Sequence, residues 1–247
     1  MRQLFYLFFI VILHVSHAQN PYPQDYFRAP LDIPLVLSGT FGELRSNHFH
    51  SGLDIKTQQR EGLKVYSAAE GYVSRIKISH YGYGKALYIT HPNGYTTVYG
   101  HLQKFSKKIE DYLKKQQYDK ETYEIELFPS SNVLKINTNE IVAFSGNTGG
   151  SGGPHLHFEI RDKKERPMNP MLFGVNIKDS RKPLVLGVFA YPIGKYSHVN
   201  HTNNRVKLRL IPKQNGVFEV ENIKACGKIG FGIVTYDQQD MAANKNG

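Results

Sequence analysis

Cysteine is almost absent from this sequence, and its absence limits how the fold can be stabilised. Cys226 is the single cysteine in 247 residues, so an internal disulfide cannot form. A zinc site rich in thiolates is excluded for the same reason. Cys226 lies in a stretch of alternating apolar residues, and we interpret it as a buried structural thiol. The fold must therefore depend on its hydrophobic core or on a metal held by other side chains.

Long apolar runs are also missing, apart from one near the N-terminus. One Arg precedes an unbroken apolar run at residues 4–13, and small residues follow at positions 16 and 18. A run of ten residues is too short to cross a bilayer. Residues 1–18 are therefore predicted to be a cleaved signal peptide with Gln19 as the new N-terminus. An uncleaved anchor is the alternative. We expect an exported protein, periplasmic or extracellular, with no integral membrane segment after cleavage.

Acidic residues are too few to balance the basic ones. The chain has 31 Lys and Arg against 21 Asp and Glu, a formal net charge of +10. Removing residues 1–18 takes away one Arg and no acid, which leaves +9. In a cytoplasmic chain this excess would favour nucleic acid as a partner. Because the chain carries an export signal, an anionic polymer such as the cell wall is the better expectation. Plain solubility is the alternative explanation.

The residue pattern predicts a mainly β protein. Residues 19–33 are rich in Pro and Tyr and are expected to form an extended lead-in. Short strand signals then follow closely, including residues 70–78, 85–91 and 94–102. Pro92, Asn93 and Gly94 separate the last two of these segments, which is typical of a β-hairpin.

The strand pattern is interrupted once and resumes twice. Residues 106–120 are Lys-rich, with Ile109 and Leu113 on one face, and predict a short surface helix capped by Ser106. New strand signals begin after residue 183 and stop at residues 244–247. We therefore expect a first domain over residues 34–182, with a short helical insertion, followed by an incomplete second β domain over residues 183–247.

The residues able to carry chemistry fall into three short motifs. The first places His50 four residues before Asp54, with Gly52 between them. The second contains His101, and the third is His155-Leu-His157. Residues two apart in a strand point to the same face, so the two histidines of the third motif are expected to lie side by side.

These motifs supply the donor set of a catalytic zinc site. His50, Asp54 and one nitrogen from the His-x-His pair provide three ligands, which leaves a fourth tetrahedral position for water. Nitrogen and carboxylate donors suit Zn²⁺ better than copper or iron–sulfur chemistry. Histidines that do not bind the metal could move protons or stabilise an oxyanion, and His101 and His155 are the candidates. No His-Glu-x-x-His motif is present.

The three motifs and their order resemble the lysostaphin-type zinc peptidases, the M23 or LytM-like family. Framing segments also match, at residues 65–73, at 83–84 and at 145–159, so that the resemblance covers roughly residues 34–175. It implies an antiparallel β-sheet peptidase domain with its site in an open groove. It also implies one Zn²⁺ per chain, bound by His50, Asp54 and His157, with His101 and His155 acting on the water and the oxyanion.

The resemblance leaves three functional classes open. The first is an active peptidoglycan endopeptidase, which acts on cell-wall peptides and not on nucleic acid. The second is an inactive regulator or activator of other wall hydrolases on the same fold, and the third is an envelope scaffold. Arg45 and Lys56 flank the first motif. A positive rim would favour the carboxylate-bearing direct cross-link, hence a D,D-endopeptidase. The Lys-rich insertion at 106–127 could line or obstruct the groove.

Other polar residues receive simpler interpretations. His48 is expected at the groove rim, and Glu159 either orients a histidine or ends its strand in water. Strand alternation would place Tyr95, Thr97 and Tyr99 on one face with His101, where they could line the groove. Four more histidines are expected to be solvated: His80, His91, His198 and His201.

Overall fold

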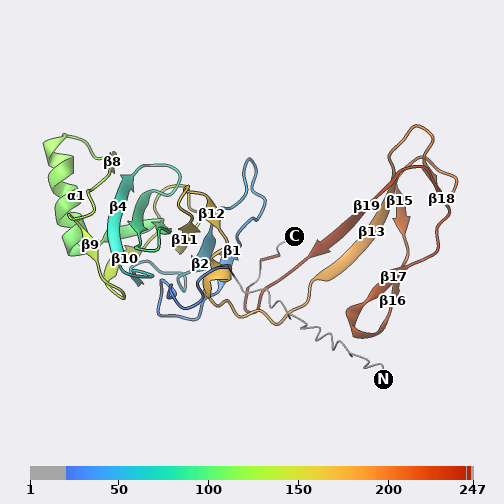
Figure 1. Cartoon of the computed structure of the whole chain (residues 1–247), viewed down its shortest axis with the longest axis horizontal. Coiled ribbons are helices and arrows are strands. Elements are labelled where there is room, and N and C mark those ends of the chain that lie inside the picture. The colour runs from blue at the N-terminus through green and yellow to red at the C-terminus, as the bar shows by residue number, and fades with distance from the viewer. Residues whose placement is uncertain (1–20, 243, 246–247) are drawn as a thin grey trace, which may run out of the picture.

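The computed structural model describes residues 21–242 and 244–245, and the signal peptide expected at 1–18 lies outside them. The described chain forms a rounded β domain and an extended β arm (Figure 1). The fold is mainly β with antiparallel pairing, as the sequence predicted. None of the described helices has the length and apolar character needed to cross a membrane.

One antiparallel sheet forms the frame of the β domain. Its strands follow the order β1-β2-β11-β6-β5-β4-β8, while β12 pairs with β11 and β9 pairs with β4. Their bounds are β1 Leu37–Gly39, β2 Leu53–Lys56, β4 Gly71–Ile78, β5 Lys85–Thr90, β6 Thr96–Gly100, β8 Ile125–Leu127, β9 Lys135–Ile136, β11 His155–Arg161 and β12 Pro167–Met168. The central position of β11, between β2 and β6, brings all three histidine motifs to neighbouring strands.

Alternation along β11 explains how this strand serves both the core and the site. Leu156, Phe158 and Ile160 are fully buried in the hydrophobic core. Burial of each such side chain stabilises the fold by about 2 kcal/mol. The residues between them point to the opposite face, so His155 and His157 leave the core side by side. The core therefore fixes the strand that presents the histidines.

A second, smaller sheet and one helix complete the domain. The sheet has the order β3-β10-β7, with β3 Lys64–Tyr66, β10 Ile141–Ser145 and β7 Leu102–Phe105. Helix α1, Lys107–Asp119, buries Ile109 and Leu113, and Ser106 is its N-cap residue, although the Ser106 side chain makes no capping hydrogen bond. Helix η1, Pro170–Phe173, follows β12.

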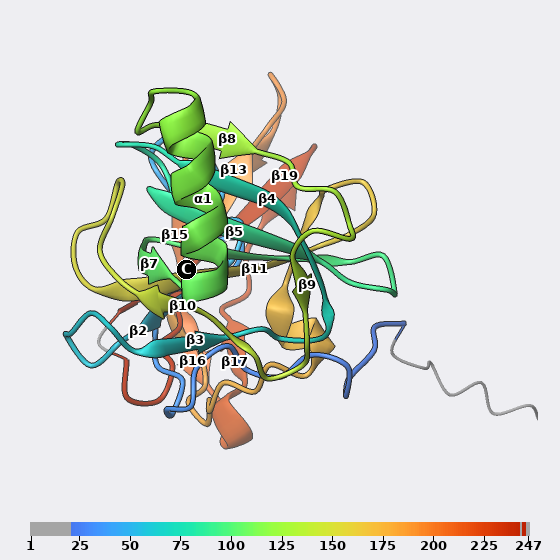
Figure 2. The ribbon, with the colours of Figure 1, turned by 90° about the vertical axis from the view of Figure 1, so that its left-hand side faces the viewer.

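Helix α1 does not line the groove, contrary to what its insertion suggested. It contacts β7 and lies on the side of the β domain away from β2 and the arm (Figures 1 and 2). None of its residues is among those that line the pockets around the histidines. The prediction that this Lys-rich segment could obstruct substrate access is therefore wrong for α1, because the helix packs against the smaller sheet.

The expected strand at residues 94–102 is broken at His101. This residue has a φ of 58°, in the left-handed region, and the chain passes there from β6 to β7 in the other sheet. Strand alternation therefore does not continue through His101. Tyr99 and Thr97 are fully buried, and Tyr95 packs against the core. The prediction that these side chains line the groove is wrong.

The arm is a long β-hairpin. Strand β13, Leu184–Pro192, pairs with β19, Ile229–Tyr236, and with β15, Val206–Leu208. Its outer part holds two small ladders, β14 His198–Val199 with β18 Ala225–Cys226 and β16 Leu210–Pro212 with β17 Phe218–Val220, beside helix η2 Gln214–Gly216. Cys226 is exposed. The interpretation of a buried thiol is wrong, because Cys226 pairs with the exposed His198, while Val199 is the residue of this ladder that is buried in a small hydrophobic cluster.

After β19 the chain returns to the β domain. Ser180 Oγ donates to the carboxylate of Asp240 at 2.9 Å. This hydrogen bond joins the two chain segments that lead into and out of the arm. Asn244 Nδ2 donates to the carbonyl oxygen of Ser38 on β1 at 2.9 Å. The arm is thus attached to the β domain at both of its ends.

Candidate metal centre

Strand pairing brings the first and third motifs together. Asp54 on β2 lies directly opposite His157 on β11 in the antiparallel register, and both side chains leave the sheet on the same face. His50 precedes β2 and turns back over this pair. The three residues are almost fully buried, with exposed fractions of 7% for His50, 8% for Asp54 and 2% for His157.

Three potential ligand atoms meet at one point. His50 Nε2 lies 3.1 Å from Asp54 Oδ1 and 3.1 Å from His157 Nδ1. His157 Nδ1 lies 2.9 Å from the same oxygen of Asp54. These atoms form a compact group that could hold a metal ion. The three residues are those that the sequence assigned to zinc.

The outer nitrogens of the two histidines are occupied by acceptors, which fixes their tautomers. His50 Nδ1 donates to the carbonyl oxygen of Thr40 at 2.8 Å, and His157 Nε2 donates to Glu159 Oε1 at 2.8 Å. In the neutral rings, the inner nitrogens therefore carry lone pairs. The two nitrogen lone pairs and the carboxylate oxygen then face one another with no proton between them, and they repel. A cation bound between them would remove this repulsion. The donor set thus fits a metal.

Glu159 is built into the sheet as the partner of His157. It is fully buried, and Arg161 Nε donates to its Oε2 at 2.6 Å. Burial opposes ionisation, but hydrogen bonds from His157 and Arg161 outweigh it and lower the pKa of Glu159 to about 2. The carboxylate stays ionised at neutral pH. Of the two interpretations left open by the sequence, the orienting role is the one that the geometry favours.

Tyr83 and Ser51 complete the surroundings of this carboxylate. Ser51 Oγ donates to Glu159 Oε1 at 2.7 Å, and the Tyr83 hydroxyl bonds to the same oxygen. The Tyr83 ring also stacks on His157, with centroids 4.5 Å apart. Burial and the nearby Glu159 charge raise the pKa of Tyr83 above its usual value, so its hydroxyl remains a donor. Sequence reasoning gave these two residues no role, since neither spacing nor residue type indicated one.

Arg45 holds the second oxygen of Asp54. Its guanidinium lies 3.1 Å from Asp54 Oδ2 and 3.5 Å from Glu43. Burial alone would raise the pKa of Asp54, but in the metal-free site protonated imidazoles of His155, His157 and His50 can donate to this carboxylate and hold its pKa far below the usual value. Gly39 on β1 makes room for this contact, because a Cβ there would collide with Arg45 and Asp54.

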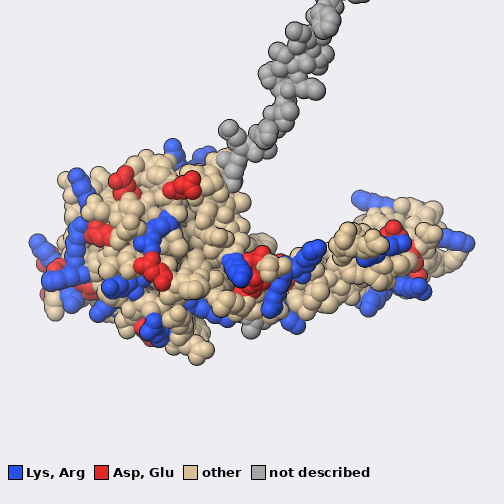
Figure 3. Space-filling model, turned by 90° about the horizontal axis from the view of Figure 1, so that it is seen from below, with Lys and Arg blue, Asp and Glu red and all other residues tan. Residues whose placement is uncertain are grey.

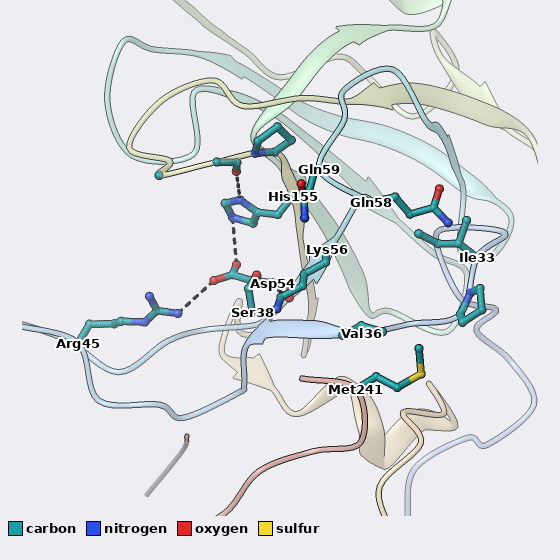
Figure 4. Close-up of a pocket in the computed structure, with 14 residues that line it drawn as sticks. Ile33, Val36, Ser38, Arg45, Asp54, Lys56, Gln58, Gln59, His155 and Met241 are labelled. Atoms are coloured by element: carbon teal, nitrogen blue, oxygen red, sulfur yellow. Dashed lines mark hydrogen bonds and ion pairs between the residues drawn. The ribbon is translucent and has the colours of Figure 1, made fainter. Parts of the chain in front are cut away.

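His155 and His101 lie beside the three converging atoms. His155 Nδ1 donates to the carbonyl oxygen of Gly153 at 2.8 Å, and its Nε2 lies 3.5 Å from Asp54 Oδ1 (Figure 4). His101 Nδ1 donates to the carbonyl oxygen of Thr148 at 2.7 Å, and the two imidazole centroids are 4.6 Å apart. Burial lowers the pKa of His101 to about 4. Both rings therefore present an Nε2 lone pair beside the metal position.

Two pockets meet over these residues. The smaller, about 430 Å³, includes all four histidines together with His48 and Tyr83. The larger, about 680 Å³, extends from Asp54 and His155 along β2 to Lys56 and the apolar Val36 (Figure 4). Arg45, Asp54, Gly152 and His155 line both pockets. The metal position thus lies at the junction of a two-armed groove.

The comparisons with known proteins agree with this arrangement. A model of peptidase family M23 matches residues 48–118. The chain is thus similar to peptidase family M23 over the segment that carries His50, Asp54 and His101.

Similarity to known peptidases covers more than half of this chain. The DD-carboxypeptidase/endopeptidase Mpg of Neisseria meningitidis serogroup B is 33% identical over 146 residues, which are 56% of this chain and 27% of that protein. The peptidoglycan DD-endopeptidase ShyA of Vibrio cholerae is 28% identical over 163 residues, 64% of this chain and 32% of that protein. The match therefore spans about a third or less of the length of these relatives. A solved zinc-containing peptidase from Vibrio cholerae is 25% identical, with a TM-score of 0.43 over 62% of this chain and 40% of its own.

The remaining histidines of the chain have other environments. His48 is exposed and lines the smaller pocket, where the sequence placed it at the rim. His80, His198 and His201 are exposed, as expected. His91 is buried, with Nδ1 2.7 Å from the carbonyl oxygen of Glu70 and Nε2 2.8 Å from Thr97 Oγ1. The interpretation of His91 as solvated is wrong, because it follows β5 at the point where the chain turns over the core.

Proposed function

We propose that this protein is an exported, zinc-dependent peptidoglycan endopeptidase that cleaves the direct D-alanyl cross-link between stem peptides. The observation that carries the proposal is the convergence of His50 Nε2, Asp54 Oδ1 and His157 Nδ1, with each imidazole held in the tautomer that a metal requires. Three protein ligands leave one position for water or substrate, which is the arrangement of catalytic rather than structural zinc.

The chain's own residues prepare this site for hydrolysis. When bound, zinc supplies a Lewis acid that activates water and polarises the scissile carbonyl. Glu159 and the Thr40 carbonyl hold the imidazoles of His157 and His50 in place. Arg45 restrains Asp54 through the oxygen that faces away from the histidines. These contacts preorganise the donor atoms, so that little reorganisation is needed when the metal binds.

His155 and His101 are proposed to move protons and to stabilise charge. The carbonyl oxygens of Gly153 and Thr148 each bind a Nδ1–H, so Nε2 of either ring can accept a proton from the attacking water. The resulting imidazolium can then donate to the leaving amine or to the oxyanion. The depressed pKa of His101 keeps this ring neutral before the reaction.

Three considerations support peptidoglycan as the substrate. Relatives that match more than half of this chain are named as a DD-carboxypeptidase/endopeptidase and as peptidoglycan DD-endopeptidases. The N-terminal sequence predicts export after Ala18. Lys and Arg side chains are spread over both the β domain and the arm (Figure 3), which suits an anionic polymer. We further propose that residues 34–182 are the peptidase domain and 183–247 a separate β unit.

The experiment that tests the function is digestion of purified, directly cross-linked peptidoglycan by mature protein loaded with Zn²⁺. Mass analysis should show monomeric stem-peptide fragments, and a chelator should abolish their release. Cleavage of pentaglycine without action on direct cross-links would contradict the proposed bond. Full zinc occupancy with no hydrolysis of either substrate would instead favour the inactive-regulator alternative.

A further inference from the structure

Lys56 occupies a defined position beside the metal ligands. It lies two residues after Asp54 on β2 and directly opposite His155 on β11. Because side chains alternate along a strand, Lys56 and Asp54 share a face, about 7 Å apart along β2. Lys56 lines the larger arm of the groove with Asp54 and His155 (Figure 4). A group bound next to the metal along this strand would therefore reach Lys56.

The charge of Lys56 is not neutralised by its neighbours. Asp54 is the single acidic residue that lines the larger pocket. Arg45 binds its Oδ2, the oxygen that faces away from the histidines. No carboxylate within residues 21–242 forms an ion pair with Lys56. Arg45, in contrast, is paired with both Glu43 and Asp54. The positive rim that the sequence assigned to both residues thus depends mainly on Lys56.

The rest of the larger pocket is neutral and partly apolar. Val36, Ile33 and Met241 contribute apolar surface, while Ser38 contributes a hydroxyl. A single ammonium among such walls attracts an anion more strongly than the same charge on an open surface. Lysine binds a carboxylate through charge-assisted hydrogen bonds. The pocket is therefore suited to a peptide that carries one carboxylate close to the scissile bond.

The turn after Lys56 adds two amide side chains to the same pocket. Gln58 and Gln59 have φ values of 57° and 58°, and both line the same pocket. Thr57 Oγ1 donates to the carbonyl oxygen of Arg60 at 2.7 Å and closes this turn. Two successive residues with positive φ form a type I′ turn, which the Arg60 N–H closes by donating to the Thr57 carbonyl oxygen at 3.2 Å. The two amide groups can hydrogen-bond a peptide main chain.

From these contacts we infer that Lys56 is a specificity-determining residue, which binds the substrate carboxylate on the carbon that bears the scissile nitrogen. The inference rests on the proposed function, because it assumes an amide carbonyl at the metal position. Two substrates have a carboxylate at that carbon. One is a direct cross-link through a diaminodiacid, and the other is a terminal D-alanyl-D-alanine. The chemistry recognised by Lys56 is the same in both.

The test compares a carboxylate substrate with its carboxamide. Diacetyl-L-lysyl-D-alanyl-D-alanine and its C-terminal amide are offered to the wild type, Lys56→Met and Lys56→Arg, and a directly cross-linked muropeptide dimer is the second carboxylate source. Lys56→Met should raise KM for the carboxylate substrates at least about tenfold, leave the amide unchanged, and keep kcat. Lys56→Arg should restore most of the preference. Lys114→Met, on the distant helix α1, is the matched control and should behave as wild type.

Equilibrium binding to the metal-free protein gives a second readout that does not depend on turnover. The wild type should bind the tripeptide more tightly than its amide, and Lys56→Met should lose this difference. If the wild type shows the binding preference, Lys56→Met loses it, and the wild type cleaves nothing, the proposed function fails and the role of Lys56 in carboxylate binding stands. If the wild type cleaves and Lys56→Met keeps the full preference for carboxylates, the role of Lys56 is overturned and the proposed function stands. A raised KM of Lys56→Met for the dimer alone, with the tripeptide unaffected, would assign the cross-link, not the free terminus, as the source of the carboxylate.

Discussion

His157 donates a hydrogen bond of 2.8 Å from Nε2 to Glu159, its neighbour two positions along β11. The strand itself therefore supplies both a potential metal ligand and the group that orients it. Because Glu159 is fully buried and bound by Arg161, it cannot turn away to solvent. The tautomer of His157 is set by the fold before any metal arrives.

Replacing Glu159 should weaken metal binding without removing a ligand. Glu159→Gln takes away the negative charge that accepts the Nε2 proton of His157, so the favoured tautomer loses its support. We expect zinc affinity to fall by about 10- to 100-fold, as measured by competition with a chelator of known affinity. Glu61→Gln, an exposed acid in the loop before β3, is the control. Unchanged affinity in Glu159→Gln would show that the carboxylate does not orient the ligand.

Four of the five histidines that line the smaller pocket should separate into two groups. His157→Ala and His50→Ala should lose zinc and activity together, whereas His155→Ala and His101→Ala should keep about one zinc per chain and lose turnover by about 100-fold or more. Metal analysis of the purified variants and hydrolysis of cross-linked dimers measure the two effects. Loss of zinc in His101→Ala would place that residue among the metal ligands and contradict its assigned role.

A side chain at Gly39 should disturb the metal site, because it would displace side chains that surround the ligands. A Cβ at this position meets the Arg45 guanidinium and the Asp54 carboxylate, so Gly39→Ala must displace one of them. We expect zinc affinity to fall by about tenfold or more, because the support of a ligating carboxylate is lost. Gly187→Ala in β13, where a Cβ would make only ordinary contacts, is the matched control. A fully loaded and active Gly39→Ala protein would argue against the role of Arg45.

His91 should make the stability of the β domain depend on pH. Burial lowers the pKa of this side chain to about 4 in the folded protein, against about 6.5 when unfolded. The unfolded chain therefore binds the extra proton first, and the contribution of His91 is complete above pH 6.5 and lost as the pH falls to 4. The loss amounts to about 3 kcal/mol.

Denaturant unfolding of the metal-free protein between pH 7 and pH 4 measures this effect. A flatter slope is expected for His91→Gln than for the wild type, because the substituted side chain does not titrate. His80→Gln, at an exposed histidine, should retain the wild-type slope. Equal slopes in wild type and His91→Gln would show that His91 is not the group responsible.

Sequence patterns located the framework of the site but not its supporting contacts. The mainly β fold and the grouping of His50 and Asp54 with one histidine of the His-x-His pair follow from residue alternation and motif spacing. The resemblance to M23 peptidases is what selected His157, and the structure places these three side chains together. The zinc itself and the roles of His101 and His155 stay predictions. Glu159 could not be decided from the sequence, because its position on β11 is equally compatible with burial and exposure.

The errors arose where tertiary structure overrides a local pattern. His101 ends its strand with a left-handed conformation, so counting alternate residues from Tyr95 gave the wrong face. His91 is buried by a turn that closes over the core, and Cys226 is exposed because it pairs with the exposed His198, whereas Val199 of the same ladder is buried. In each case the neighbours that decide exposure come from distant parts of the chain.

The double attachment of the arm has a mechanical consequence. Ser180 and Asp240 bind the two roots of the hairpin to each other, and Asn244 binds the returning chain to Ser38 on β1. The chain that returns from the arm is thereby connected to β1, the strand that adjoins β2 and Asp54. A force on the arm would reach the edge of the groove through this connection.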